Sequence, residues 1–331
     1  MDHSDLISKL LKGNTRAAAR LITIVENDIE AAEQVVNSIY QYTGRAYILG
    51  ITGAPGTGKS TFISTLTKNF IEEGKKVGII CVDPTSPLTG GALLGDRIRM
   101  KQHFSLDNVF IRSMANRGQL GGLARATEDT IKILDAYGCD IIIVETVGVG
   151  QSEVDIFKSA QTVLVLLVPG LGDDIQVIKA GIMEITDIFV VNKMDLPGAD
   201  KKVSDIMQML EFKSSYKYES ADFDEKFAKI NQWTPEISKV NSKTGENFEV
   251  LIKLIEKHKL FLQQSGIILN YLKNRIKTES IQILRHKLTK KIEDLMNTDA
   301  EIDKYIDQVI QKSLDPYSMA NQIIKMLGLE K

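Results

Sequence analysis

The chain has 331 residues, of which 43% are hydrophobic, so it can bury a packed core in one large α/β domain or in two smaller ones. Its 41 basic and 43 acidic residues leave a net charge of −2. This net charge excludes a general electrostatic attraction to nucleic acid or to an anionic membrane. Binding through a local basic patch is still possible.

Cysteine and histidine usage adds two further exclusions. Cys81 and Cys139 each lie at the edge of an apolar run, which predicts two buried thiols in a reducing compartment and no disulfide framework. The four histidines are far apart in the chain, so no metal-ligand cluster emerges from them.

The acidic start of the chain lacks the patterns of a secretion signal or a transit peptide, and no apolar run reaches the roughly 18 residues of a membrane span. We expect a cytoplasmic protein.

Residues 1–45 predict a helical N-terminal extension, because apolar residues recur there at three- and four-residue spacing. The run from Asn27 to Glu30 is typical of a capped helix start.

Strand-like and helical patterns then alternate. Short apolar runs at 47–51, 77–82, 109–111, 140–144, 162–168 and 187–191 are separated by stretches of helix length, and a last strand is plausible at 236–240. Such runs are buried on both faces, so we expect an α/β fold with a mostly parallel sheet flanked by helices, placed at 46–246. Ligands of these sheets bind beyond the carboxyl ends of the strands.

The first of these strands leads into a glycine-rich phosphate-binding motif. It fits G-x-x-x-x-G-K-[ST] between a strand and a helix, which is the context of a P-loop. Its backbone N–H groups can cradle a polyphosphate, Lys59 supplies a positive charge near the β- and γ-phosphates, and Ser60 is the expected Mg²⁺ ligand. The nucleotide-binding residues predicted here are Gly53, Ala54, Pro55, Gly56, Thr57, Gly58, Lys59, Ser60 and Thr61.

Acidic residues follow two other strands. Asp83 ends the second strand and is the first candidate for holding Mg²⁺, with Asp96 second, although Asp83 could instead only cap the turn before Pro84. Glu145 follows a very apolar run, and Gly148 comes three residues later, where a backbone N–H can sense a γ-phosphate. Glu145 is a further candidate metal ligand. The sequence leaves open whether Gln151 or a neighbour orients the attacking water.

A guanine-recognition motif follows the sixth run. In Asn192-Lys193-Met194-Asp195 the aspartate carboxylate can accept two hydrogen bonds from guanine N1–H and N2–H₂, which adenine does not offer. The alternative is that Asp195 caps a helix before Leu196. Asn241, Ser242 and Lys243 stand where a loop supporting guanine is expected.

Residues 247–331 predict a helical C-terminal extension with apolar stripes. This is more helix than a P-loop domain needs, which favours a dimerisation surface over a layer packed on its own domain.

Together these motifs resemble those of the MeaB/ArgK family of P-loop GTPases, which act as chaperones of adenosylcobalamin-dependent acyl-CoA mutases. The similarity covers nearly the whole chain. Besides the P-loop, the strings that carry it are 83–97, 112–118 with 120–123, 145–153, 169–174 with 179–181, and Asp315-Pro316-Tyr317.

The resemblance implies a GTPase whose switch loops, at about 83–97, 145–158 and 170–181, transmit the nucleotide state to a mutase of the methylmalonyl-CoA type. Such a protein gates cobalamin loading and protects or reactivates the mutase. The resemblance also implies a homodimer held through the C-terminal helices. The chain carries no D-x-H-x-x-G cobalamin motif, so the mutase chemistry belongs to the partner. One departure is Asn241, where relatives typically carry Ser or Thr.

Two other classes of function compete with this interpretation. A kinase of an arginine/ornithine transport system would use ATP, which Asn192 and Asp195 argue against. A metal-delivery GTPase would need a stretch rich in histidine or cysteine, and the sequence has none.

Overall fold

The computed structural model describes residues 3–83, 108–115, 122–146, 160–170, 185–219, 233–298 and 300–328. Its contacts divide the chain into two compact units, Met1–Arg275 and Ile276–Lys331, and each unit is described by itself. The predicted division into 1–45, 46–246 and 247–331 stays a prediction.

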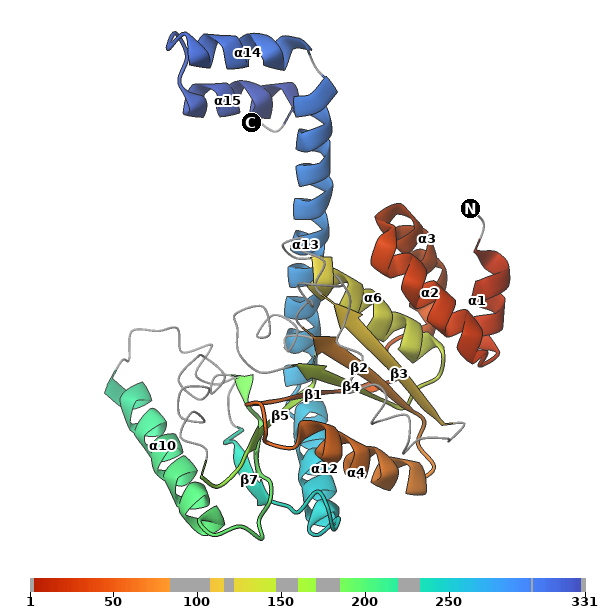
Figure 1. Cartoon of the computed structure of the whole chain (residues 1–331), viewed down its shortest axis with the longest axis vertical. Coiled ribbons are helices and arrows are strands. Elements are labelled where there is room, and N and C mark those ends of the chain that lie inside the picture. The colour runs from red at the N-terminus through yellow and green to blue at the C-terminus, as the bar shows by residue number, and fades with distance from the viewer. Residues whose placement is uncertain are drawn as a thin grey trace. The chain divides into compact units, whose positions relative to one another are not determined.

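The first unit is built on a seven-stranded sheet with the order β3-β2-β4-β1-β5-β6-β7 (Figure 1). All of its strand pairs are parallel, which confirms the predicted fold class. The strands are β1 (Tyr47–Gly53), β2 (Val77–Asp83), β3 (Val109–Ala115), β4 (Ile141–Thr146), β5 (Thr162–Leu167), β6 (Ile188–Val191) and β7 (Glu236–Lys239). Each predicted apolar run is a strand, with bounds that shift by a few residues.

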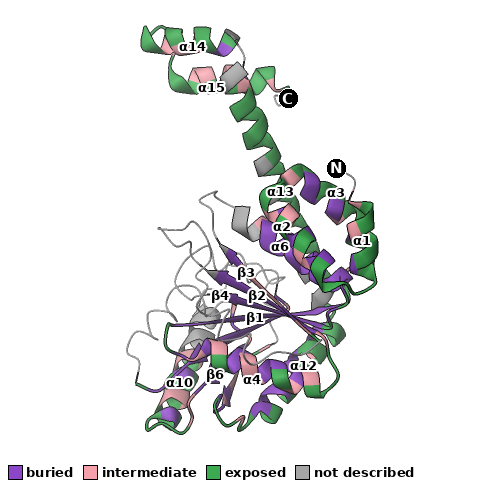
Figure 2. Ribbon diagram, turned by 45° about the vertical axis from the view of Figure 1, so that its right-hand side comes forward, coloured by how far each residue is buried: buried purple, intermediate pink, exposed green. Residues whose placement is uncertain are grey.

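Two apolar clusters cover the two faces of this sheet. On one face, α4 (Lys59–Glu72) and α12 (Phe248–Gln264) pack on strand residues such as Ile51 and Leu166, with Phe62 and Phe248 in ring contact at 5.3 Å between centroids. On the other face lie α6 (Gly122–Ala136), α10 (Ala199–Glu219) and the N-terminal helices. Successive strand side chains alternate between the two clusters, as the period of two requires. Because both faces are covered, the inner strands β1, β4, β5 and β6 are wholly buried, whereas the edge strands β3 and β7 are only partly buried (Figure 2).

The N-terminal extension consists of α1 (Ser4–Leu11), α2 (Thr15–Asn27), α3 (Ile29–Ile39) and the 3₁₀ turn η1 (Tyr40–Tyr42). Asn14 and Asp28 cap α2 and α3, each accepting a hydrogen bond from a backbone N–H three residues on. The predicted capped start at Asp28 is thereby confirmed.

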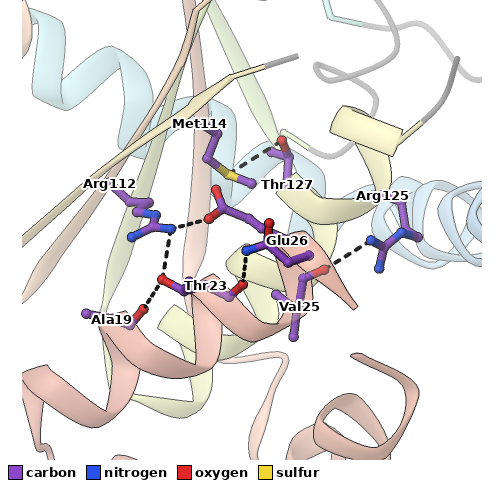
Figure 3. A network of polar contacts seen from close by, with 9 residues as sticks. Ala19, Thr23, Val25, Glu26, Arg112, Met114, Arg125 and Thr127 are labelled. Atoms are coloured by element: carbon purple, nitrogen blue, oxygen red, sulfur yellow. Dashed lines mark hydrogen bonds and ion pairs between the residues drawn. The ribbon is translucent and has the colours of Figure 1, made fainter. Parts of the chain in front are cut away.

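Polar contacts fix this extension to α6 and β3 (Figure 3). Arg112 on β3 forms an ion pair with Glu26 and donates to Thr23 Oγ1 at 3.1 Å. Arg125 on α6 donates to the carbonyl oxygen of Val25 at 3.0 Å, near the end of α2 where carbonyls lack helical partners. The carboxylate of Asp135 accepts three backbone N–H groups, from residues 44, 45 and 46, at 2.6 to 3.2 Å. The extension is therefore a packed layer of the first unit.

The second unit holds most of α13 (Ile267–Thr298) together with α14 (Ala300–Ile310) and α15 (Pro316–Met326). Among its described side chains, Ile302 and Ile323 are the buried apolar ones. The Asp315 carboxylate caps α15, whose first residue is Pro316, a residue suited to that position. Within the described residues, no helix combines the length and apolarity that crossing a bilayer requires.

Candidate functional site

The phosphate-binding loop connects the end of β1 to the start of α4. Gly56 and Gly58 both have φ of +86°, a conformation that side chains with a Cβ rarely adopt. A Cβ on Gly53 would lie 2.5 Å from the carbonyl oxygen of Leu166, and one on Gly58 would lie 2.9 Å from Nδ2 of Asn192. Glycine is needed at Gly53 and Gly58 because the backbone is approached so closely there.

Lys59 lies at the start of α4 and its side chain is turned back over the loop. Its Nζ donates to the carbonyl oxygens of Gly53 at 2.7 Å and Ala54 at 3.3 Å, and the residue is 8% exposed. The hydroxyl of Thr57 also donates to Ala54. A buried ammonium at a helix N-terminus makes this end of the sheet strongly attractive to a polyphosphate. Pro55 lies within this loop, and Ser60 and Thr61 are in the first turn of α4.

Asn192 connects the phosphate loop to the two loops predicted to hold the base. Its Nδ2 donates to the carbonyl oxygen of Thr57 at 2.8 Å. Its Oδ1 accepts the backbone N–H of Lys193 at 2.8 Å, the backbone N–H of Ser242 at 3.1 Å and the Ser242 hydroxyl at 2.7 Å. The residue is 1% exposed, so these bonds form out of water. The structure thus brings together three motifs that lie 135 and 50 positions apart in the sequence.

The rest of the N-K-x-D segment is fixed by similar contacts. Lys193, whose φ is +56°, places its Nζ 2.9 Å from the carbonyl oxygen of Gly56. The backbone N–H of Met194 donates to Val240 at 3.1 Å. Asp195 is exposed, and α10 begins only at Ala199, so Asp195 does not cap that helix.

The loop from Asn241 to Glu246 closes on itself through a bridge between those two residues. The Asn241 side chain donates from Nδ2 to Asp195 Oδ1 at 3.0 Å, and its Oδ1 accepts the N–H of Lys243 at 3.0 Å. Thr65 of α4 donates its hydroxyl to the carbonyl oxygen of Ser242 at 2.7 Å. Sequence reasoning missed Thr65 altogether, because a threonine inside an amphipathic helix carries no signal of its own.

Two of the predicted acidic residues lie at the carboxyl ends of neighbouring strands, Asp83 in β2 and Glu145 in β4. β2 and β4 pair so that Cys81 is level with Glu145, and Asp83 is the last residue of β2. Glu145 is 7% exposed and lies level with Ile51 of β1, two residues before the phosphate loop begins. Asp96, Gly148, Gln151 and most of the three switch loops lie outside the described residues.

This sheet topology and this loop define a P-loop nucleoside triphosphatase. Comparison with known proteins identifies it further. Residues 18–297 match the family described as methylmalonyl Co-A mutase-associated GTPase MeaB, and the chain belongs to that family and is a GTPase.

Several relatives support this placement. A protein of Pyrococcus horikoshii, named as a GTPase, is 50% identical over 323 residues, which cover 98% of each chain. The GTPase ArgK of Escherichia coli is 32% identical over 311 residues, covering 93% of this chain and 90% of its own. A mitochondrial methylmalonic aciduria type A homolog of Caenorhabditis elegans is 36% identical over 228 residues, covering 64% of this chain and 56% of its own. The crystal structure of a LAO/AO transport system kinase shares the fold, with a TM-score of 0.64 and 24% identity over 98% of this chain and 97% of that one.

Proposed function

We propose that this GTPase selects guanine nucleotides through Asn192, Lys193, Met194 and Asp195 and through the loop Asn241, Ser242 and Lys243. The observation that carries the proposal is Asn192, which holds the phosphate loop and the 241–243 loop at once. A nucleotide whose phosphates lie on the loop from Gly53 to Thr61 then has its base beside Asp195. Lys59 is placed to neutralise charge on the transferred phosphoryl group, and positioning of this kind supplies most of the catalysis in phosphoryl transfer.

Nucleotide binding and turnover of GTP and ATP test this base site. We expect Lys59→Ala to abolish turnover of both nucleotides, and Asp195→Ala to remove the preference for GTP. Asp195→Asn should shift the preference to xanthosine triphosphate, because xanthine presents a carbonyl where guanine presents N2–H₂ and the asparagine amide can donate to it. Asp205→Asn, at an exposed residue of α10, is the matched control. Equal binding of ATP, with phosphate transferred to a protein, would instead establish the transport-system kinase.

We further propose that Mg²⁺ binds beside the phosphates, held by Ser60 and by acidic residues from among Asp83, Asp96 and Glu145. A hydroxyl at the first turn of α4 and a buried carboxylate at the end of β4 are the oxygen donors that Mg²⁺ prefers, and few protein ligands are needed because phosphates and waters complete its shell. The ion would neutralise the negative charge that develops on the phosphates in the transition state of GTP hydrolysis. Glu145→Gln should raise the Mg²⁺ concentration needed for half-maximal GTP turnover. An unchanged requirement would exclude Glu145 as a ligand.

The partner we propose is an adenosylcobalamin-dependent acyl-CoA mutase of the methylmalonyl-CoA type, whose cofactor loading and protection this GTPase would control. Support comes from the family description, which names a mutase-associated GTPase, and from the Caenorhabditis elegans relative. Addition of purified methylmalonyl-CoA mutase should raise the rate of GTP hydrolysis severalfold, and cobalamin loading of the mutase should depend on the bound nucleotide. Neither effect is expected with Lys59→Ala. No change in either rate would overturn the assignment of this partner.

We also propose a homodimer formed through the C-terminal helices. The part of α13 in the second unit exposes a row of large apolar side chains, a surface that a soluble monomer seldom leaves uncovered. Its members, at three- and four-residue spacing, are Ile281, Leu284, Leu288, Ile292 and Met296. Leu284→Lys, at a side chain 58% exposed, should convert the dimer into a monomer in light scattering. Met207→Lys on α10, at a residue 52% exposed and outside the C-terminal helices, is the control and should leave the mass unchanged.

The cytoplasm is the location we propose for this protein. Cys81 and Cys139 are both free and buried, which agrees with a reducing compartment. Fractionation of cells that produce the full chain tests this, and recovery with a membrane pellet would contradict it.

A further inference from the structure

A hydrogen bond joins the phosphate-binding helix to the loop predicted to support guanine. Thr65 lies one turn and a half into α4, and its hydroxyl donates to the carbonyl oxygen of Ser242 at 2.7 Å across a sequence separation of 177 residues. A Cβ built on Gly245 would meet Thr65 Cγ2 at 3.9 Å. Thr65 therefore lies beneath the loop at both of its ends.

The peptide that Thr65 holds carries the contact onward. A trans peptide is planar, and its C=O and N–H point in opposite directions. When the Ser242 carbonyl is held by Thr65, the N–H of Lys243 on the same peptide is aimed to the other side. There it donates to Asn241 Oδ1 at 3.0 Å.

The Asn241 amide is the next planar group in the series. Its Oδ1 also accepts the N–H of Thr244 at 3.4 Å, so two backbone donors fix which end of the amide is oxygen. The Nδ2 end must then face Asp195, and it donates to Asp195 Oδ1 at 3.0 Å. A continuous series of hydrogen bonds thus runs from Thr65 through Ser242, Lys243 and Asn241 to the carboxylate of Asp195.

We infer that Thr65 is a positioning residue for guanine recognition, acting through this series on Asp195. The inference rests on the proposed base site. An exposed carboxylate has free rotation about its side-chain bonds, yet it must lie in the plane of the base to accept N1–H and N2–H₂ together. Holding Asp195 Oδ1 with Asn241 reduces this freedom before the nucleotide arrives, and Thr65 holds Asn241 in turn.

The test uses the full chain and compares binding of GTP with binding of inosine triphosphate, which lacks the 2-amino group. Thr65→Val should lower the ratio of the two affinities by about 5-fold, the worth of one hydrogen bond. Thr65→Ser keeps the hydroxyl and should keep the ratio. Thr67→Val is the matched control, because the buried hydroxyl of Thr67 lies on the same helix and has no partner among the described residues. That control should leave both affinities unchanged.

A double-mutant comparison separates positioning from general stability. If Thr65 acts through Asp195, Thr65→Val should cause no further loss in the Asp195→Ala background. Equal losses for GTP and inosine triphosphate, or a loss that adds fully to that of Asp195→Ala, would overturn the inference and leave the base site intact. If Asp195→Ala alone left the preference for GTP unchanged, the proposed base site itself would be wrong, and the role of Thr65 with it.

Discussion

Asn192 donates from its side chain to the carbonyl oxygen of Thr57 at 2.8 Å, and this bond joins the end of β6 to the phosphate loop. The Oδ1 atom of the same amide accepts hydrogen bonds from the backbone N–H and from the hydroxyl of Ser242. A single buried side chain therefore sets the distance between the loop that meets the phosphates and the loop that is proposed to meet the base.

Replacing Asn192 tests this connection. Asn192→Ala should weaken binding of both GTP and GDP by about 10-fold or more, because several buried groups lose their partners at about 1 to 3 kcal/mol each. Asn192→Asp keeps the acceptor for Ser242 but sets a carboxylate against the carbonyl oxygen of Thr57. It should bind nucleotide as weakly as the alanine variant. Near-normal affinity in Asn192→Asp would show that the bond to Thr57 contributes little.

Two glycines of the phosphate loop offer a matched comparison. Gly56 and Gly58 share a φ of +86°, so alanine at either costs about 1 kcal/mol of backbone strain. Only at Gly58 would the new Cβ meet another atom, Nδ2 of Asn192 at 2.9 Å, whereas nothing lies within 4 Å at Gly56. Gly58→Ala should therefore reduce GTP affinity far more than Gly56→Ala, as measured by titration calorimetry. Equal losses would mean that conformational strain alone accounts for both effects.

The ion pair between Arg112 and Glu26 should stabilise the N-terminal layer. Their side chains are only 17% and 14% exposed, so Glu26→Gln leaves a guanidinium largely desolvated without its counter-ion. We expect a loss of about 1 to 3 kcal/mol in the free energy of unfolding, read from urea denaturation.

The exposed pair of Lys9 and Asp5 is the control for this measurement. These side chains are 53% and 75% exposed, and Asp5→Asn should change stability by less than about 0.5 kcal/mol. If Glu26→Gln is equally neutral, the N-terminal helices are held by apolar packing and the ion pair contributes nothing.

The sequence predicted the strands well because buried parallel strands leave continuous apolar runs, such as Ile141 to Val144. It also predicted which motifs meet, since carboxyl ends of parallel strands share one edge of the sheet. It did not predict the contact of Thr65 with Ser242 or the side-chain role of Asn241. Those contacts join a side chain to a distant backbone group, which produces no periodicity and no motif. The sequence likewise did not predict the contacts of His258, which is a buried residue of α12.

A polar cluster at the amino ends of the strands, opposite the nucleotide edge, surrounds His258. Its Nδ1 lies 2.7 Å from Thr162 Oγ1, which also contacts the Tyr47 hydroxyl, and its Nε2 lies 3.4 Å from Asp187 Oδ1. These contacts are all satisfied when Tyr47 donates to Thr162, Thr162 donates to Nδ1, and Nε2–H points at Asp187. Burial disfavours the charged imidazolium and so favours this neutral form of the histidine.

Burial acts in opposite directions on the two titratable groups of this cluster. Desolvation lowers the pKa of His258 from 6.5 to about 4. It raises the pKa of Asp187 from 3.8 to about 7, partly offset by the N–H of Val163, which donates to the carboxylate. Between about pH 4 and 6.5 the unfolded chain holds a proton on His258 that the folded protein lacks, so this residue makes stability rise with pH. Between about pH 4 and 7 the folded protein holds a proton on Asp187 that the unfolded chain has lost, so this residue makes stability fall.

In the intact protein, the pH dependence of stability due to His258 and that due to Asp187 oppose each other. A variant that lacks one of the two residues should show the pH dependence of the other. The difference in Tm between Asp187→Asn and the wild type should increase from pH 4.5 to 6.5, while the difference for His258→Asn should decrease over the same range. The change in stability due to Asp187 should be smaller than its pKa shift alone implies, because its side chain keeps 26% exposure and water screens its charge in part. Subtracting the wild-type curve removes the contribution of all other titrating groups. Differences of the same sign, or flat differences in both variants, would show that the cluster does not carry these opposed protonation states.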